Sequence, residues 1–167
     1  EVANSPTLFG QAPGDLKYRD VNGDGKLDAN DRTIIGNSIP DLVYGFNVEL
    51  GYKSLTLSAD FQGQLGSDIY NGKQAIRFTT LNYEDKYNSH WTGPGSSNSD
   101  PRPSLGGVNF LPSSYYIEDG SFLRLRTLTL NYSMPNSLMQ KLSITNSNIY
   151  VRATNLFTAT SFTGYSP

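Results

Sequence analysis

The chain has 167 residues, a net charge of −2 at pH 7 and a pI of about 5.3, so it is long enough for one domain and its charge gives no reason to expect nucleic-acid binding. It contains no cysteine, which excludes disulfides and thiolate metal sites, and its one histidine, His90, argues against a histidine-based catalytic or zinc centre. The 12% aromatic residues, 16 glycines and mean hydropathy of −0.43 suit a β protein with many turns.

Residues 1–41 contain a stretch, Asp20 to Asp31, with the spacing of a calcium-binding loop. Calcium takes about six to eight oxygen ligands, and alternating positions of such a loop can wrap one centre. The predicted ligands at positions one, three, five, seven and twelve are Asp20, Asn22, Asp24, the backbone carbonyl of Lys26, and Asp31. Gly25 allows the sharp turn at position six, and Asp28 at position nine would act through a water molecule.

The flanks of this loop argue against an EF-hand, which needs a helix on each side. Pro13 and Gly14 precede the loop, and Pro40 leads into a strand pattern. Position twelve is also Asp rather than the Glu that grips calcium with two oxygens. We therefore expect a structural Ca²⁺ on a β scaffold rather than a calcium sensor. The alternative is a solvated turn, because Asp, Asn and Gly are also common turn residues.

Residues 42–65 predict an antiparallel hairpin. Apolar and polar residues alternate strictly from Leu42 to Lys53 and again from Leu55 to Leu65. A tight turn at Lys53 and Ser54 joins the two strands.

Residues 121–157 predict a second hairpin, with strands over 122–134 and 148–157. Leu128, Leu130 and Tyr132 define the apolar face of the first strand. Uninterrupted alternation also places Arg124 and Arg126 on that face, so the face is predicted to become charged toward the start of the strand. Pro135 ends this strand, and a short connection with helical turns around 138–142 follows.

Strand length and alternation leave two architectures open. The predicted strands run to about ten to twelve residues, against about five or six in ordinary globular sheets, and this is the length that crosses a bilayer at a tilt. In an outer-membrane barrel the polar face, with Asn47, Glu49 and Asp60, would line a wet lumen. A soluble β-sandwich also alternates, and the barrel signal is weak for any single strand.

The polar stretch 66–120 holds a possible helix, with Ile76, Thr80, Tyr83 and Tyr87 at helical spacing, and a Gly/Pro/Ser-rich loop over 93–101. Barrels of the outer membrane have short periplasmic turns and long extracellular loops. This rule places 1–41, 66–120 and 158–167 outside the cell, and the turns at 53–54 and 136–147 in the periplasm. The final closing strand would then be missing, so we expect a segment of a longer polypeptide; a start at Glu1 without a signal peptide agrees.

Motifs in chain order resemble the C-terminal signature of the SusC/RagA family, TonB-linked outer-membrane proteins of Bacteroidetes. They begin with Gly14-Asp15-Leu16-Lys17-Tyr18-Arg19-Asp20 and continue through the calcium-like loop. Further matching segments are 32–37, 40–41, 44–45, 61–63, 68–71, 118–125, 128–130, 155–158 and 163–165.

The resemblance implies an all-β fold in which this chain supplies about four long strands of an antiparallel transmembrane β-barrel of about 22 strands. It implies a multi-pass protein of the outer membrane that imports oligosaccharides or peptides, driven by TonB. Its partners would be a SusD-like lipoprotein lid, the rest of its own barrel, an N-terminal plug and TonB. The plug and the TonB-contacting segment are expected to lie outside this chain.

Three aromatic residues of the long stretch, Trp91, Tyr115 and Tyr116, are candidates for contact with cargo or partner, and the alternative is that they pack the loop onto the barrel rim. Glu49 and Asp60 could be read as a carboxylate pair for glycoside hydrolysis, but hydrophilic lining explains them better, and the chain is not expected to be an enzyme.

The second function hypothesis is a secreted, calcium-stabilised β module that binds glycans. Solubility without detergent separates the two.

Overall fold

The computed structural model describes residues 5–75, 88–104, 106–141, 143–145 and 147–167. The chain divides into two compact units. The loop unit comprises Glu1–Gly36 and Tyr70–Ile117, and the sheet unit comprises Asn37–Ile69 and Glu118–Pro167. The two long polar segments of the sequence therefore fold together as one unit, and the two predicted hairpins fold as the other.

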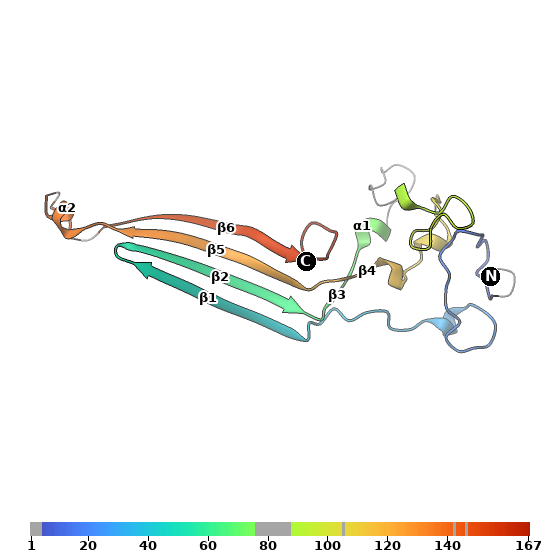
Figure 1. Ribbon diagram of the computed structural model, residues 1–167. Coiled ribbons are helices and arrows are strands. Elements are labelled where there is room, and N and C mark those ends of the chain that lie inside the picture. Colours follow the sequence, from blue (N-terminus) through green and yellow to red (C-terminus); the bar gives the residue numbers. More distant parts are fainter. Residues whose placement is uncertain (1–4, 76–87, 105, 142, 146) are drawn as a thin grey trace. The chain divides into compact units, whose positions relative to one another are not determined.

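The sheet unit is built on a four-stranded antiparallel sheet with the order β1-β2-β5-β6 (Figure 1). Its strands are β1 (Leu42–Tyr52), β2 (Leu55–Leu65), β5 (Phe122–Ser133) and β6 (Asn148–Thr160). The all-β antiparallel fold is thus confirmed, although β6 is longer than predicted. The β1–β2 turn and helix α2 (Asn136–Lys141) lie at the same end of the sheet (Figure 1). Lys53 makes that turn with a positive φ of 53°.

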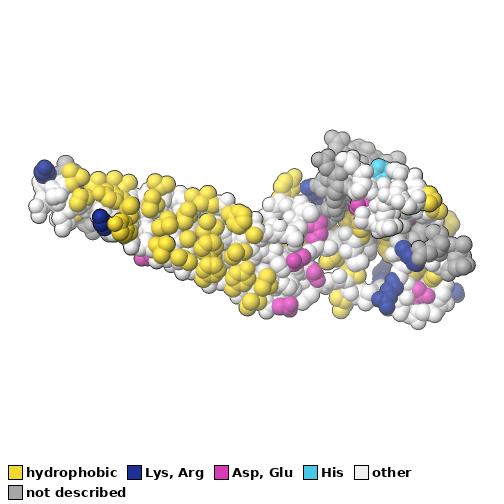
Figure 2. All heavy atoms as spheres, in the orientation of Figure 1, with side chains coloured by type: hydrophobic (Ala, Val, Ile, Leu, Met, Phe, Trp, Pro, Cys, Tyr) yellow, Lys and Arg dark blue, Asp and Glu magenta, His cyan; other side chains and the backbone are white. Residues whose placement is uncertain are grey.

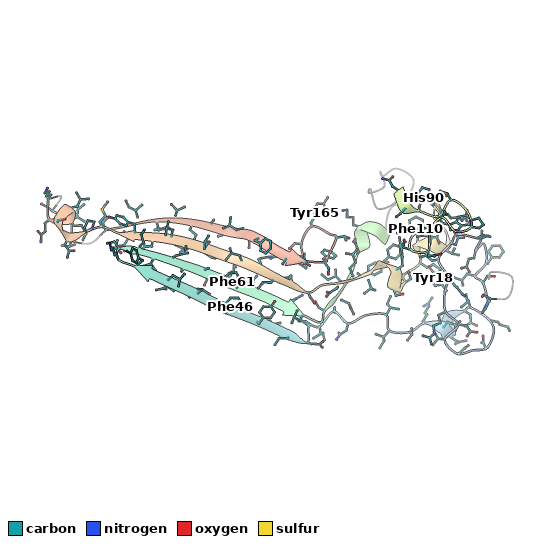
Figure 3. The ribbon with its side chains drawn as sticks, in the orientation of Figure 1. Tyr18, Phe46, Phe61, His90, Phe110 and Tyr165 are labelled. Carbon is teal, nitrogen blue, oxygen red and sulfur yellow. The ribbon has the colours of Figure 1, made fainter. Side chains whose placement is uncertain are left out.

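One face of the sheet is apolar across all four strands. Two rows of paired residues show this continuity: Leu50, Leu57, Leu130 and Val151, and next to them Tyr52, Leu55, Tyr132 and Ile149. These side chains are exposed, from 37% for Leu57 to 70% for Val151. Figure 2 shows apolar side chains gathered over the sheet, and Phe46 and Phe61 stack on it with ring centroids 4.7 Å apart (Figure 3). The sheet unit therefore presents an apolar surface that it does not bury itself.

A β-bulge corrects the prediction for Arg124 and Arg126. Thr127 pairs with Asp60 and Leu125 pairs with Phe61, so Arg126 has no partner on β2. This extra residue reverses the alternation, because each residue before it points to the opposite face from the one an unbroken strand would give. Arg124 consequently shares the polar face with its partner Gln62, and the apolar face does not become charged at that position.

The loop unit contains short elements: η2 (Ala29–Asp31), α1 (Gly72–Ala75), η4 (Val108–Phe110) and η5 (Ser114–Tyr116). Strands β3 (Asp68–Tyr70) and β4 (Ile117–Asp119) pair in a separate two-stranded sheet. The predicted helix bearing Ile76, Thr80, Tyr83 and Tyr87 lies outside the described residues. Of the helices that are described, none is long and apolar enough to cross a membrane.

Candidate functional site

The Asp20–Asp31 loop is organised by its own carboxylate and amide oxygens. The Asp20 carboxylate accepts hydrogen bonds from the backbone N–H groups of Gly23 (2.6 Å) and Gly25 (2.8 Å). Asn22 accepts from the N–H of Asp24, and Asp24 accepts from that of Lys26, both at 2.9 Å. Gly25 has a φ of 80°, so the sharp turn predicted at loop position six is present.

The last predicted ligand, Asp31, closes the loop onto its own beginning. One oxygen of its carboxylate accepts from Val21 N–H and the other from Asp28 N–H, both at 2.8 Å. These hydrogen bonds, with that from Asp28 first, lower the pKa of Asp31, because they stabilise the ionised form. Asp28 in turn caps the one-turn helix η2 by accepting from Asn30 N–H at 2.7 Å. The loop is therefore closed into a ring by the carboxylates of its first and last residues, Asp20 and Asp31.

The donor set fits calcium in kind, because hard oxygen atoms predominate and the loop's turns are already formed. In the part of the chain that the structure describes, no three His, Cys, Asp or Glu side chains gather closely enough to hold a metal ion. Coordination would therefore need the Asn22 amide oxygen and the Lys26 carbonyl beside the carboxylates. It would also need Asp20, Asp24 and Asp31 to turn free lone pairs toward one point.

Sequence reasoning missed the polar centre of the loop unit, which forms around Asp15. The Asp15 side chain is only 1% exposed and bonds to Arg102 Nε at 2.7 Å. Asn109 donates to the same carboxylate at 2.8 Å and accepts from the N–H of Leu16 at 2.8 Å. Burial raises the pKa of Asp15, but the hydrogen bonds from Arg102, Ala12 and Asn109 outweigh it, so the pKa is lowered. Arg102 and Asn109 lie 87 and 94 residues from Asp15 in the sequence, so no local spacing signals them.

The three aromatic candidates differ in their surroundings. Tyr116 is 3% exposed and its hydroxyl donates to the Asn109 carbonyl, so in this structure it packs the loop unit. Of the two interpretations of this residue, the packing role is the one that its burial favours. Tyr115 and Trp91 are partly exposed, and Tyr115 donates to Asp100 at 2.9 Å.

A cleft of about 330 Å³, lined by polar and apolar groups alike, opens beside Trp91 within the loop unit. Its walls come from two segments, residues 5–17 and residues 91–101, and include Gln11, Lys17, Asn98 and Asp100. A hydrogen bond of 2.7 Å from Arg102 N–H, directly after the second segment, to the Gly14 carbonyl joins the two segments. Within the second segment, Trp91 N–H donates to the Asp100 carbonyl at 3.1 Å. Tyr18, labelled in Figure 3, anchors the first segment through a 2.6 Å bond from its hydroxyl to Val108. Burial raises the pKa of this hydroxyl.

The polar face of the sheet carries the two carboxylates considered for hydrolysis. Asp60 pairs with Asn47 and accepts from its amide at 2.6 Å, and Glu49 pairs with Ser58. Arg124 lies on this face as well and donates to Thr158 (3.0 Å) and Ser166 (2.8 Å). Hydrogen-bonded polar pairs of this kind form a hydrophilic surface.

Comparison with known proteins gives consistent relatives, although no family model matches the chain. The chain is 35% identical over 150 residues to TonB-dependent receptor P26 of Formosa agariphila, an alignment that covers 87% of the chain and 15% of that receptor. It is 26% identical to TonB-dependent receptor SusC of Bacteroides thetaiotaomicron, over 93% of the chain and 15% of that protein. The chain thus spans about 15% of the length of these relatives.

A solved structure agrees with these sequence relatives. The RagAB peptide importer in its open-open state matches with a TM-score of 0.68 and 27% identity, covering 85% of the chain and 16% of the RagAB chain. The match confirms the antiparallel all-β fold. These relatives are receptors and an importer rather than enzymes, in agreement with the expectation that this chain is not an enzyme.

Proposed function

Because this chain is a SusC/RagA-like segment of a TonB-dependent receptor, we propose that it forms part of an outer-membrane importer of oligosaccharides or peptides. The observation that carries the proposal is the exposed apolar face shared by four long strands. A strand of 11 residues extends about 36 Å, and at a tilt of about 40° it spans about 28 Å, close to the apolar band of an outer-membrane barrel. The opposite, polar face then lines the lumen.

The partners in this proposal follow from the relatives. A SusD-like lipoprotein would close the extracellular mouth, and the plug, the remaining strands and the TonB-contacting segment would come from the rest of the polypeptide. The similarity to SusC and to RagAB supports this arrangement. Under the proposal, the loop unit lies outside the cell, where it can meet lid or cargo.

The test is the native mass and composition of the complex that contains this chain, extracted from membranes in mild detergent. The importer predicts a large particle that holds a long polypeptide and a lipoprotein. A detergent-free, soluble species near 18.4 kDa would instead support the secreted glycan-binding module.

We also propose that the Asp20–Asp31 loop binds one structural Ca²⁺. The support is the spacing of the oxygen donors and the turns that Gly23 and Gly25 make at φ values of 76° and 80°. The loop adjoins no pair of helices among the residues described, so the structure offers no element that calcium would switch. Calcium would therefore stiffen the extracellular loop.

Calcium binding is tested on the intact complex by limited proteolysis and thermal unfolding, with and without a chelator. Wild-type protein should lose protection of the loop when calcium is removed. Asp20→Ala and Asp24→Ala should be cut rapidly under both conditions, because each removes a predicted ligand. Asn30→Ala, a neighbouring exposed change outside the predicted ligand set, should keep the wild-type response. Equal protection of the wild type with calcium and with chelator would rule out the proposal.

A further inference from the structure

The cleft beside Trp91 combines an aromatic surface with polar side chains that are held in place. Gly14 lies so close to the six-membered ring of Trp91 that a Cβ atom on Gly14 would come within 2.3 Å of Trp91 Cε3. The indole is thereby fixed on the Gly14 side, while it remains partly exposed and lines the cleft. A ring held in this way loses little freedom when a ligand packs against it.

The polar wall of the cleft is also fixed in orientation. Asp100 accepts from the hydroxyls of Tyr115 (2.9 Å), Ser89 (2.9 Å) and Ser99 (3.0 Å). Ser97 accepts from the Asp100 N–H at 3.2 Å, which ties the loop beneath the carboxylate. Gln11 donates to the Leu16 carbonyl at 2.6 Å on the opposite wall. Most of the cleft's polar groups are neutral hydroxyls and amides.

We propose that this cleft is a subsite for a neutral sugar unit of the imported cargo, with the ring packed on Trp91 and its hydroxyls bonded to Asp100 and Asn98. This inference rests on the importer function proposed above and narrows its substrate class to oligosaccharides. An aromatic surface beside a few fixed polar groups suits a ligand with apolar C–H faces and polar edges, as sugar rings have. The volume of about 330 Å³ is at the small end of ligand pockets, as expected for a terminal or branch unit.

A peptide fits this cleft less well. Extended peptides are usually held by main-chain bonding to a free strand edge, by clusters of charge or, when rich in proline, by grooves lined with several aromatic residues. The cleft wall is built from loop segments, and Trp91 is the one aromatic residue among the described residues that line it. Of the three charged residues in this described lining, Asp15, Lys17 and Asp100, the first is held by Arg102 and the last accepts from three hydroxyls of this chain. The alternative is contact with a lid protein, which binding measurements on the intact complex separate from cargo binding.

The experiment measures binding to the purified, intact receptor–lipoprotein complex. The probes are maltohexaose, xylohexaose, mannohexaose and a pool of random hexapeptides. Trp91→Ala should weaken the binding of at least one hexasaccharide by about tenfold, through loss of the aromatic contact. Asn98→Ala, which changes an exposed side chain of the cleft without touching the Gly14–Trp91 packing, should weaken the same sugar several-fold. Phe9→Ala is the matched control, because Phe9 is an exposed aromatic of the same unit that does not line the cleft.

The results of these measurements decide whether the cleft beside Trp91 binds a sugar unit. Loss of sugar binding in both cleft variants but not in Phe9→Ala supports the subsite. The subsite is overturned by any of three results: unchanged sugar affinity in both cleft variants, binding of peptides alone, or binding of no probe. The proposed importer function still stands in these cases if the lipoprotein co-purifies. If the cleft variants lose the lipoprotein but keep sugar affinity, the surface is a lid contact instead. Failure of the wild-type complex to assemble would count against the proposed function rather than against the subsite.

Discussion

Single residues of the loop unit are positioned by backbone that only glycine can supply. Gly14 has a φ of 88°, and a Cβ atom at this position would overlap the Trp91 ring, so both its conformation and its missing side chain matter. Its carbonyl accepts from Arg102 N–H at 2.7 Å, and the Arg102 side chain holds the buried carboxylate of Asp15. One glycine therefore connects the indole to the ion pair.

We predict that Gly14→Ala destabilises the loop unit by about 1–3 kcal/mol more than Gly10→Ala does. Both glycines have positive φ, 88° and 79°, but a Cβ atom at Gly10 has nothing within 4 Å. The comparison isolates the clash with Trp91 from the backbone strain. The difference in stability is measured by hydrogen exchange at the Arg102 and Trp91 amides of the intact complex. We expect these amides to exchange at least about fivefold faster in Gly14→Ala than in Gly10→Ala. Equal exchange in the two variants would show that Trp91 moves aside freely.

At the scale of elements, the bulge at Arg126 decides which side chains face which environment. The register also shifts between β5 and β6: Leu125 pairs with Phe157 and Thr127 with Thr154, so Asn155 and Leu156 lie opposite Arg126 alone. Asn155 has a φ of 53°, a conformation that Asn tolerates better than most residues. Two irregularities at one level of the sheet thus keep Leu123 and Leu125 on the apolar face and Arg124 on the polar face.

Spin labels test this assignment. Single labels at Leu123, Arg124 and Leu125 of the receptor in lipid vesicles should alternate, with Leu123 and Leu125 relaxed by oxygen dissolved in the bilayer and Arg124 by a water-soluble nickel complex. Leu130 and Asn131, which lie beyond the bulge, are the reference pair for lipid and water. An uninterrupted strand would reverse the pattern at the three test positions and leave the reference pair unchanged.

At the scale of the whole molecule, two units with different kinds of stabilisation share one chain. The sheet unit relies on strand pairing and leaves its apolar face exposed. The loop unit relies on buried polar side chains, with Asn109 4% exposed and Asp15 bonded to three partners. Titration of Asp15 should therefore affect the loop unit alone.

The lowered pKa of Asp15 gives the direction of this effect. A folded-state pKa below the ordinary 3.8 contributes stability above that value, and the contribution is lost as the pH falls through the lowered pKa. At pH 7, Asp15→Asn should speed amide exchange at Ala12 and Leu16 by about tenfold or more, since it leaves buried donors without an acceptor. The difference in exchange rate at Ala12 and Leu16 between this variant and the wild type should shrink below pH 4. At Leu57 and Leu130, the variant and the wild type should exchange at the same rate at every pH. Glu49→Gln, a charge removal on the sheet, should leave Ala12 and Leu16 unaffected; equal loss of protection in both units would contradict separate stabilisation.

The sequence by itself determined the four long antiparallel strands and nearly all their ends, because period-two alternation, as from Leu42 to Leu65, is a local signal that the hydrophobic effect enforces. It also predicted the turn at Gly25, since the position of a glycine among Asp and Asn residues is local too. It did not predict the short strands β3 and β4. Only the tertiary structure decided the face of Arg124, because a bulge is fixed by what the neighbouring strands pair with. It likewise decided the burial of Tyr116 and the meeting of Asp15 with Arg102 and Asn109, because contacts between residues far apart in the chain leave no periodic trace in the sequence.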